Sequence, residues 1–257
     1  MITDWYFYLA AIPAVILMGF SKGGFSGLSI LSTPVVALIV GPVRAAAIML
    51  PILVVQDFVS MWAYRRSCAW NILAFMLPGS LIGIFIGWLV AAEVSDLLIG
   101  AIVGFVAVGF VVLALIKARR RGALKQETFL PPSPAPALFW GTGAGFTSFV
   151  SHQGGPMFQI YVLPRGLSPE LFAGTSTFFF AITNLVKLVP YAALGQFSRA
   201  NLETSAVLFP LAAVATLAGV WLVRRVSPEK FYSIVYSLTM LVGLKLIFDW
   251  VVVLTRG

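Results

Sequence analysis

The chain has 257 residues, of which 60% are hydrophobic and only 10% are charged. Soluble globular domains are roughly half apolar and a quarter charged, so this composition excludes an ordinary soluble protein. The net charge of +8 fits basic loops that set the topology of a membrane protein, and no nucleic-acid partner is expected. One cysteine and one histidine exclude an internal disulfide and are too few for a metal site.

The first segment, residues 5–40, is apolar but is interrupted by Gly19-Phe20-Ser21-Lys22-Gly23-Gly24. A double glycine beside a lysine predicts a helix that breaks within the membrane, with a second half-helix beginning near residues 25–27. Unwound backbone is tolerated at that depth only where it lines a cavity inside the protein. The leg at residues 5–18 is about 21 Å long, too short to cross a hydrocarbon core of about 30 Å.

Three further spans complete the first half, at residues 45–64, 70–92 and 97–116. The last two carry no formal charge, and each reaches the roughly 20 residues that a transmembrane helix needs. Within the second of the three, Gly79, Gly83 and Gly87 recur every four residues. Such a stripe of small residues predicts close helix packing rather than chemistry.

A linker at residues 118–136 is basic at first and then Pro-rich, which is typical of an exposed, extended connector. The second half begins with another interrupted segment, residues 137–163, broken at Val150-Ser151-His152-Gln153-Gly154-Gly155-Pro156. Three spans follow it, at residues 169–194, 201–223 and 228–254.

The two halves repeat each other. Gly23-Gly24 recurs 131 residues later as Gly154-Gly155, and Gly87 recurs 132 residues later as Gly219. A repeated helix break is a sequence indicator of the substrate site in secondary transporters. The predicted domains are an N-terminal membrane repeat at residues 1–117, a basic, Pro-rich cytoplasmic linker at 118–136 and a C-terminal membrane repeat at 137–257.

Loop charges distinguish two topologies. Three of the 17 Lys and Arg residues lie within spans, which leaves 14 outside them. They divide 9 to 5 if both broken segments cross the membrane, and 11 to 3 if both are re-entrant hairpins, with Arg44, Arg199 and Arg256 then outside. The positive-inside rule favours the hairpins. Each half then makes an odd number of crossings, so we predict an all-α polytopic membrane protein with two inverted structural repeats, each a broken or re-entrant helical hairpin plus three transmembrane helices.

Lys22 is the first candidate for substrate binding. A lysine at membrane depth is costly and tends to face a cavity or a partner. With Ser21, Gly23-Gly24 and Ser26 it predicts an oxyanion site, because N–H groups at the start of a following half-helix favour anions. The alternative is that Lys22 reaches the membrane surface or pairs with Asp57 as a structural contact.

The second break supplies Ser151, His152, Gln153 and Gly154-Gly155 as equivalent candidates for substrate binding. His152 is the only histidine, and when protonated it adds positive charge to an anion site. A lone histidine in a helix bundle is also often a hydrogen-bonded structural residue, and both interpretations stay open.

Asp57 is the one acidic residue within the first three full spans. It is a candidate for proton or ion coupling, together with His152, or it only neutralises Lys22. The sequence does not rank these roles.

Thr175 and Asn184 are further candidates for lining the substrate site. In the same span, Lys187 is expected to reach the membrane interface with its long side chain. Lys245 and Asp249 are four residues apart on a predicted helix, and we expect them to form a structural ion pair.

The sequence contains no convincing enzyme signature. Gly19-Phe20-Ser21-Lys22-Gly23 matches the G-x-S-x-G nucleophile pattern, but that pattern requires a strand–turn–helix context with acidic and histidine partners. The sequence also has no phosphate-binding loop for ATP. We therefore expect no enzyme activity and no cofactor, and transport that draws on ion gradients or membrane potential.

Three glycine-based motifs extend across the chain. They are Gly19-Phe20-Ser21-Lys22-Gly23-Gly24 with the following Gly27, Gly141-x-Gly143-x-Gly145-Phe146 before Ser151-His152-Gln153-Gly154-Gly155, and Ala173-Gly174-Thr175-Ser176. Together with the duplication they resemble the sulfite exporter TauE/SafE family of bacterial membrane permeases. The resemblance covers essentially the whole chain, and it implies a transporter of sulfur-containing anions such as sulfite and sulfonates.

We therefore expect a secondary transporter of small sulfur-containing oxyanions in a bacterial inner membrane, with export as the favoured direction. The anion is expected near the membrane midplane, between the two helix breaks. The alternatives are a passive anion channel and, from another class, an intramembrane enzyme or a structural subunit. The expected partners are the anionic substrate and the lipid bilayer; the oligomeric state stays open, with a homodimer as one option.

Overall fold

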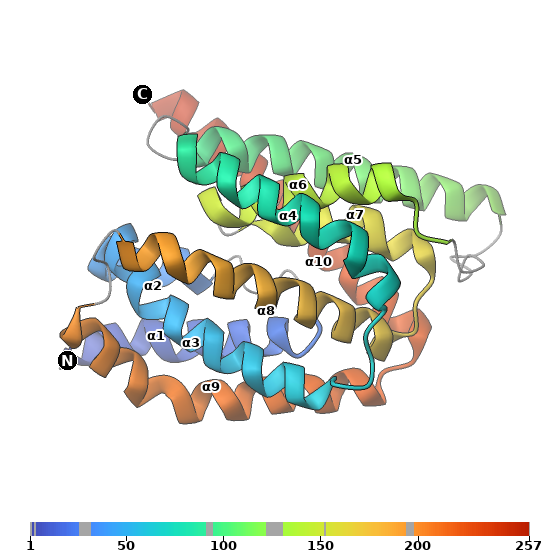
Figure 1. The fold of residues 1–257 in the computed structure, drawn as a ribbon. Helices are drawn as coiled ribbons and strands as arrows, with labels where there is room; N and C mark the ends of the chain where they lie inside the picture. Colours follow the sequence, from blue (N-terminus) through green and yellow to red (C-terminus); the bar gives the residue numbers. More distant parts are fainter. Residues whose placement is uncertain are drawn as a thin grey trace. The chain divides into compact units, whose positions relative to one another are not determined.

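The computed structural model describes Ile2 and residues 4–25, 32–90, 95–121, 131–151, 153–193 and 198–256. The regular structure in these residues is entirely helical, as predicted. In chain order (Figure 1) the helices are α1 (Trp5–Lys22), α2 (Ser32–Val40), α3 (Pro42–Ala63), α4 (Trp70–Val90), α5 (Asp96–Arg121), α6 (Pro134–Ser151), α7 (Gly154–Val162), the 3-10 helix η2 (Leu163–Arg165), α8 (Pro169–Ala193), α9 (Arg199–Arg225) and α10 (Pro228–Arg256).

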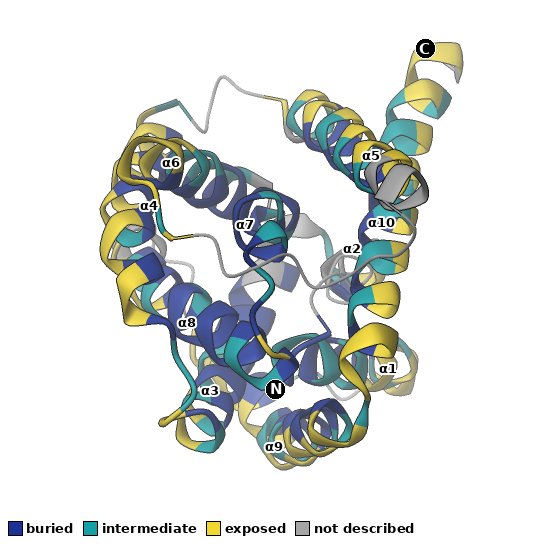
Figure 2. Cartoon of the chain, turned by 90° about the vertical axis from the view of Figure 1, so that its right-hand side faces the viewer, coloured by how far each residue is buried: buried dark blue, intermediate teal, exposed yellow. Residues whose placement is uncertain are grey.

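Six of the described helices are long and apolar enough to cross a membrane. They are Trp5–Lys22, Trp70–Val90, Leu97–Ile116, Pro169–Val189, Arg199–Arg225 and Pro228–Thr255. Large apolar side chains such as Trp88, Phe105 and Phe248 are exposed on them, and exposed faces run along α4, α5 and α10 (Figure 2). Extended apolar surfaces of this kind mark contact with a membrane or a partner. The predicted all-α polytopic membrane fold is confirmed.

The helices form two compact units that do not follow the sequence halves. Unit 1 comprises Met1–Cys68 and Pro169–Val226, and unit 2 comprises Ala69–Ser168 and Ser227–Gly257. Each unit therefore combines helices from both halves of the chain. The predicted domains at residues 1–117 and 137–257 describe the sequence repeat and stay a prediction.

In unit 1, α3 and α9 run in the same direction (Figure 1). Near their first residues, the Ser205 hydroxyl of α9 donates to the Ile48 carbonyl of α3 at 2.7 Å. Near their last residues, the Arg224 guanidinium donates to the Ala63 carbonyl at 2.8 Å. The two helices are thus parallel along most of their length.

Helix α1 is also parallel to α3. The Gln56 side chain of α3 donates to the Val15 carbonyl at 3.1 Å, and Tyr64, just after α3, donates to the Gly23 carbonyl, just after α1, at 2.5 Å. Val36 of α2 packs in the same core cluster as the first parts of α1 and α3. Because α1 and α3 are parallel, the chain between them returns to the end where α1 begins, as a re-entrant hairpin does.

The basic residues of unit 1 are grouped accordingly. Arg65 follows α3 at the end where Arg224 binds the α3 carboxyl terminus. At the opposite end, Arg44 donates to Asn201 near Arg199, at 3.3 Å. The re-entrant topology requires this division, whereas the crossing topology would place Arg199 on the same side as Arg65.

Small residues allow α1 and α9 to approach closely. A Cβ atom added at Gly19 would lie 2.5 Å from the Ala215 Cβ, and one added at Gly23 would lie 2.5 Å from the Gly219 Cα. Distances this short leave no room for a side chain, so the absence of Cβ atoms sets the spacing of the two helices.

In unit 2, α4 packs in parallel on α6 in the same manner. Gly79 and Gly83 lie directly against the backbone at Thr142, and Gly87 lies against Phe149. The predicted packing role of this glycine stripe is therefore confirmed, with α6 as its partner.

Helices at equivalent positions of the two halves pack antiparallel. In unit 1, the end of α3 at Tyr64 lies beside Gly174 at the start of α8. In unit 2, Gly104 of α5 lies against Gly243 of α10, and the ring of Phe110, one to two turns further along α5, stacks on that of Tyr236, earlier in α10. Opposite directions for equivalent helices are what an inversion produces, which supports the predicted inverted repeat; the inversion of the complete halves stays a prediction.

In two places the helices extend further than the sequence indicated. Helix α1 continues to Lys22 instead of ending near residue 18, and its 18 residues extend about 27 Å. Helix α5 continues to Arg121 and α6 begins at Pro134, so helix extends into both ends of the predicted linker at 118–136. Lys, Arg and Ala are good helix formers, and proline suits the first position of a helix. Residues 122–130 lie outside the described part of the chain.

Candidate substrate site

The first break starts where α1 ends. The N–H groups of Gly23 and Gly24 donate back to the carbonyls of Gly19 and Ser21, at 2.8 and 3.1 Å. Gly24 has a φ of 133°, a backbone conformation that residues other than glycine rarely adopt. Phe25 is not helical, so the expected half-helix does not begin there; Ser26 and Gly27 lie outside the described residues.

Neighbouring helices hold this break in place. The Tyr64 hydroxyl donates to the Gly23 carbonyl, and a Cβ atom added at Gly24 would lie 2.8 Å from both Ala173 of α8 and Val223 of α9. Three helices thus surround the double glycine. The two glycine N–H groups are hydrogen-bonded within α1, so anion binding by them would require those bonds to open.

Lys22, one residue before the break, is paired. Its Nζ lies 2.5 Å from Asp57 Oδ1, and the two side chains are only 12% and 4% exposed. Asn184 Nδ2 of α8 donates to the other carboxylate oxygen, Asp57 Oδ2, at 2.7 Å. Of the two interpretations left open for Lys22, the structure contains the contact with Asp57.

Lys187 belongs to the same cluster, which the sequence did not predict. It is 1% exposed and interacts electrostatically with both Lys22 and Asp57. The expectation that it reaches the membrane interface is wrong, because it lies one turn beyond Asn184 on the buried face of α8. The cluster therefore contains two lysines and one carboxylate, contributed by α1, α3 and α8.

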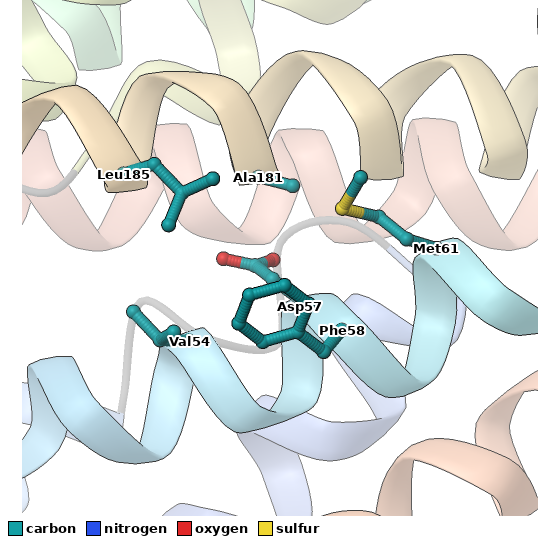
Figure 3. A pocket seen from close by; sticks show the side chains of 6 residues that line it. All are labelled: Val54, Asp57, Phe58, Met61, Ala181 and Leu185. Atoms are coloured by element: carbon teal, nitrogen blue, oxygen red, sulfur yellow. The ribbon is translucent and has the colours of Figure 1, made fainter.

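A narrow hollow between α3 and α8 leads to this cluster. The Asp57 carboxylate points into it (Figure 3). The other side chains that line it are apolar: Val54, Phe58, Met61, Ala181 and Leu185. Phe58 and Leu185 are exposed whereas Asp57 is buried, so the carboxylate lies on the inner side of this hollow.

The remaining first-break candidates are placed as follows. Thr175 is fully buried, and its hydroxyl donates to the Leu171 carbonyl of its own helix at 2.6 Å. Thr177, two residues on, donates to the Lys22 carbonyl at 3.4 Å. Ser21 is partly buried on α1. Unit 1 thus brings Lys22, Asp57 and Asn184 together. Thr175 is two residues from Thr177, but its own hydroxyl is bonded within α8.

The second break lies between α6 and α7 in unit 2. The Gln153 N–H donates to the Thr147 carbonyl at 3.1 Å, and its side chain lies beside Gly100 of α5. Gly154 and Gly155 are the first residues of α7, and a Cβ atom added at Gly155 would meet no atom of the described residues within 4 Å. As far as the described residues extend, the start of this helix leaves space beside Gly155, and a helix N-terminus favours an anion. His152 and the Ser151 side chain lie outside the described residues.

Two further ion pairs join residues outside the cluster at the first break. Lys245 and Asp249 form the predicted ion pair on α10, and Arg224 pairs with Glu170 at 3.3 Å. In the described part of the chain, His, Cys, Asp and Glu residues form no cluster able to hold a metal ion.

The family model for the sulfite exporter TauE/SafE matches residues 11–246, which include both breaks and parts of every helix. The chain belongs to the sulfite exporter TauE/SafE family. No curated protein and no solved structure matches it. Membership of TauE/SafE makes this chain a multi-pass membrane protein of a transporter family, in agreement with the six apolar helices.

Proposed function

We propose that this TauE/SafE protein is a secondary transporter that exports small sulfur-containing oxyanions, of the sulfite or organosulfonate type, across a bacterial inner membrane. The family points to this class of substrate. The main observation behind the proposal is the buried cluster at the first break, where Lys22 pairs with Asp57 and the buried Lys187 interacts electrostatically with both.

Buried charge at membrane depth is costly and usually functional. Lys22 and Lys187 provide up to two positive charges beside the single carboxylate of Asp57, and positive charge of this kind attracts an anion. The ammonium of Lys22 and the amide of Asn184 are donors suited to sulfonate or sulfite oxygens, and ionic hydrogen bonds of this kind are stronger than neutral ones. They would replace the water that the anion loses on leaving solution.

Because the second break repeats the first in sequence, it is proposed to bind the anion as well. Gly154 and Gly155 supply N–H groups at the start of α7, and Ser151, His152 and Gln153 precede them. Export of an anion needs no further energy source in a cell with a negative interior, because each charge gains about 2.3 kcal/mol per 100 mV of membrane potential.

Counterflow in proteoliposomes tests the proposal. Vesicles loaded with unlabelled sulfite or methanesulfonate should accumulate labelled substrate transiently, which a carrier does and a passive channel does not. Lys22→Gln and His152→Ala should each reduce the initial rate by at least about tenfold. Lys245→Gln is the matched control, since this lysine pairs within α10. Unchanged transport in both site variants would reject the proposed site.

A further inference from the structure

Asp57 is held as a substrate anion would be held. Its two oxygens accept from donors on two different helices, Lys22 Nζ of α1 and Asn184 Nδ2 of α8, at 2.5 and 2.7 Å. A carboxylate and a sulfonate or sulfite group both present oxygens that share negative charge. The groups best suited to bind an anion in unit 1 are therefore already occupied by an anion that belongs to the protein.

We propose that Asp57 is an internal, protonatable competitor of the substrate: its carboxylate occupies Lys22 and Asn184 in the substrate-free protein, and an arriving oxyanion displaces it as the carboxylate takes up one proton. This inference rests on the proposed function and states how its site is regulated. It makes anion binding and proton binding interdependent.

The surroundings of Asp57 explain the need for a proton. A carboxylate released from Lys22 faces the hollow of Figure 3, whose other lining side chains are apolar. With Lys22 bound to the substrate, that carboxylate keeps only Lys187 as a neighbouring cation and lies next to a second anion, which is unfavourable in a buried site. Protonation removes that charge. With a monovalent substrate the cluster keeps its net charge, since the carboxylate charge lost to the proton is replaced by that of the anion.

Few other groups near Asp57 titrate. Lys22 faces it from α1 and Lys187 from α8. Helix α2 carries no titratable side chain, and residues 208–215 of α9, part of which packs in the core with α3, are apolar. Protonation of Lys187 would also favour an anion, so Lys187 is the group from which Asp57 has to be distinguished.

Methanesulfonate is the probe of choice because it stays a monovalent anion throughout the pH range in which proteins are stable. Any pH dependence of its binding then comes from the protein. Binding to the purified, detergent-solubilised protein would be measured by calorimetry between pH 5 and pH 9, in the wild type and in Asp57→Asn and Lys187→Met. Asparagine keeps the shape of aspartate but neither competes as an anion nor takes up a proton.

The wild-type affinity should fall about tenfold per pH unit once Asp57 is ionised, because one proton is linked to each anion. Asp57→Asn should remove this dependence and bind methanesulfonate at least tenfold more tightly than the wild type at pH 9. Lys187→Met should bind more weakly but keep the dependence. In weakly buffered solution with a pH-sensitive dye, the wild type should take up about one proton per anion bound.

Three results would overturn the inference. They are binding to the wild type without proton uptake, a pH dependence that survives in Asp57→Asn, and a dependence that disappears only in Lys187→Met. Proton uptake is measured on the wild type, so it tests the inference even if Asp57→Asn misfolds. If neither methanesulfonate nor sulfite binds the wild type or any folded variant, the proposed function fails and this inference fails with it.

Discussion

Gly23 and Gly219 face each other where α1 and α9 meet, so closely that a Cβ atom on Gly23 would lie 2.5 Å from the Gly219 Cα. The two glycines come from different halves of the chain, yet both belong to unit 1. In unit 2, the glycine stripe of α4, which precedes the linker, packs on α6, which follows it. The first leg of each broken segment therefore packs on a helix from the other half.

Substituting Gly23 by alanine should destabilise the protein by about 1–3 kcal/mol, the usual cost of overpacking, because the facing backbone has to move. Gly109→Ala is the matched control, since a Cβ atom at Gly109 on α5 meets no described residue within 4 Å. That variant should be neutral or more stable by up to about 1 kcal/mol, because alanine is the better helix former. Thermal unfolding in detergent measures both. Equal melting temperatures for the two variants would contradict the close approach.

The contact between Lys22 and Asp57 should show strong energetic coupling. Lys22→Met removes a cation in direct contact with the buried carboxylate, and breaking a buried pair costs about 3–5 kcal/mol. In the double variant Lys22→Met/Asp57→Asn no charge is left unpaired within that contact, so most of the lost stability should return. Transport should stay absent in the double variant, because the cation that binds the substrate is missing. A double variant that transports normally would make the pair structural only.

The helix breaks were predictable because their cause is local. Gly23-Gly24 and Gly154-Gly155 interrupt apolar segments, and the structure ends α1 at Lys22 and starts α7 at Gly154. The pairing of Lys22 with Asp57 was one of two interpretations, since a lone cation and a lone carboxylate in neighbouring spans are natural partners. Neither conclusion required knowledge of the tertiary packing.

The burial of Lys187 was not predictable in the same way. Its position near mid-span was visible, but whether its side chain points outward or inward depends on which face of α8 packs on α3. Nothing in the sequence states that face. The packing of α1 on α9 was hidden for a similar reason: Gly219 was recognised as the repeat of Gly87, but contacts between residues about 200 positions apart leave no local pattern.

Tyr64 should influence transport more than stability. Tyr64→Phe removes the hydrogen bond to the Gly23 carbonyl, and leaving that buried acceptor without a partner should cost about 1–3 kcal/mol. Tyr8→Phe is the control, because Tyr8 donates to the Ile2 carbonyl at the other end of α1, at 2.9 Å. Both variants should unfold at slightly lower temperature, but only Tyr64→Phe should change the counterflow rate. The same counterflow rate in both variants would show that the Tyr64 hydrogen bond to the first break has no role in transport.

Cys68, in the loop between α3 and α4, should react slowly with alkylating reagents. Burial raises the pKa of its thiol to about 12 from an ordinary value of 9.0. At pH 8 the reactive thiolate is then about a thousandfold rarer, and its higher intrinsic nucleophilicity recovers only part of this, which leaves a rate roughly 50-fold lower than that of a free thiol. The rate should rise about tenfold per pH unit up to the raised pKa. Labelling at pH 8 as fast as in the denatured chain would contradict the burial.

Cysteine labelling from the two sides of the membrane tests the re-entrant topology, in a Cys68→Ala background. Arg165 is buried, so the exposed Ser168 beside it is the better position on that loop. Ser168→Cys and Arg225→Cys should react with an impermeant maleimide from the cytoplasmic side, and Arg44→Cys from the opposite side. This labelling pattern is expected only if both broken segments return to the side from which they enter, which is the topology that the positive-inside rule favours. If Arg44→Cys and Arg225→Cys react from the same side, the segments cross the membrane and the second half is not inverted.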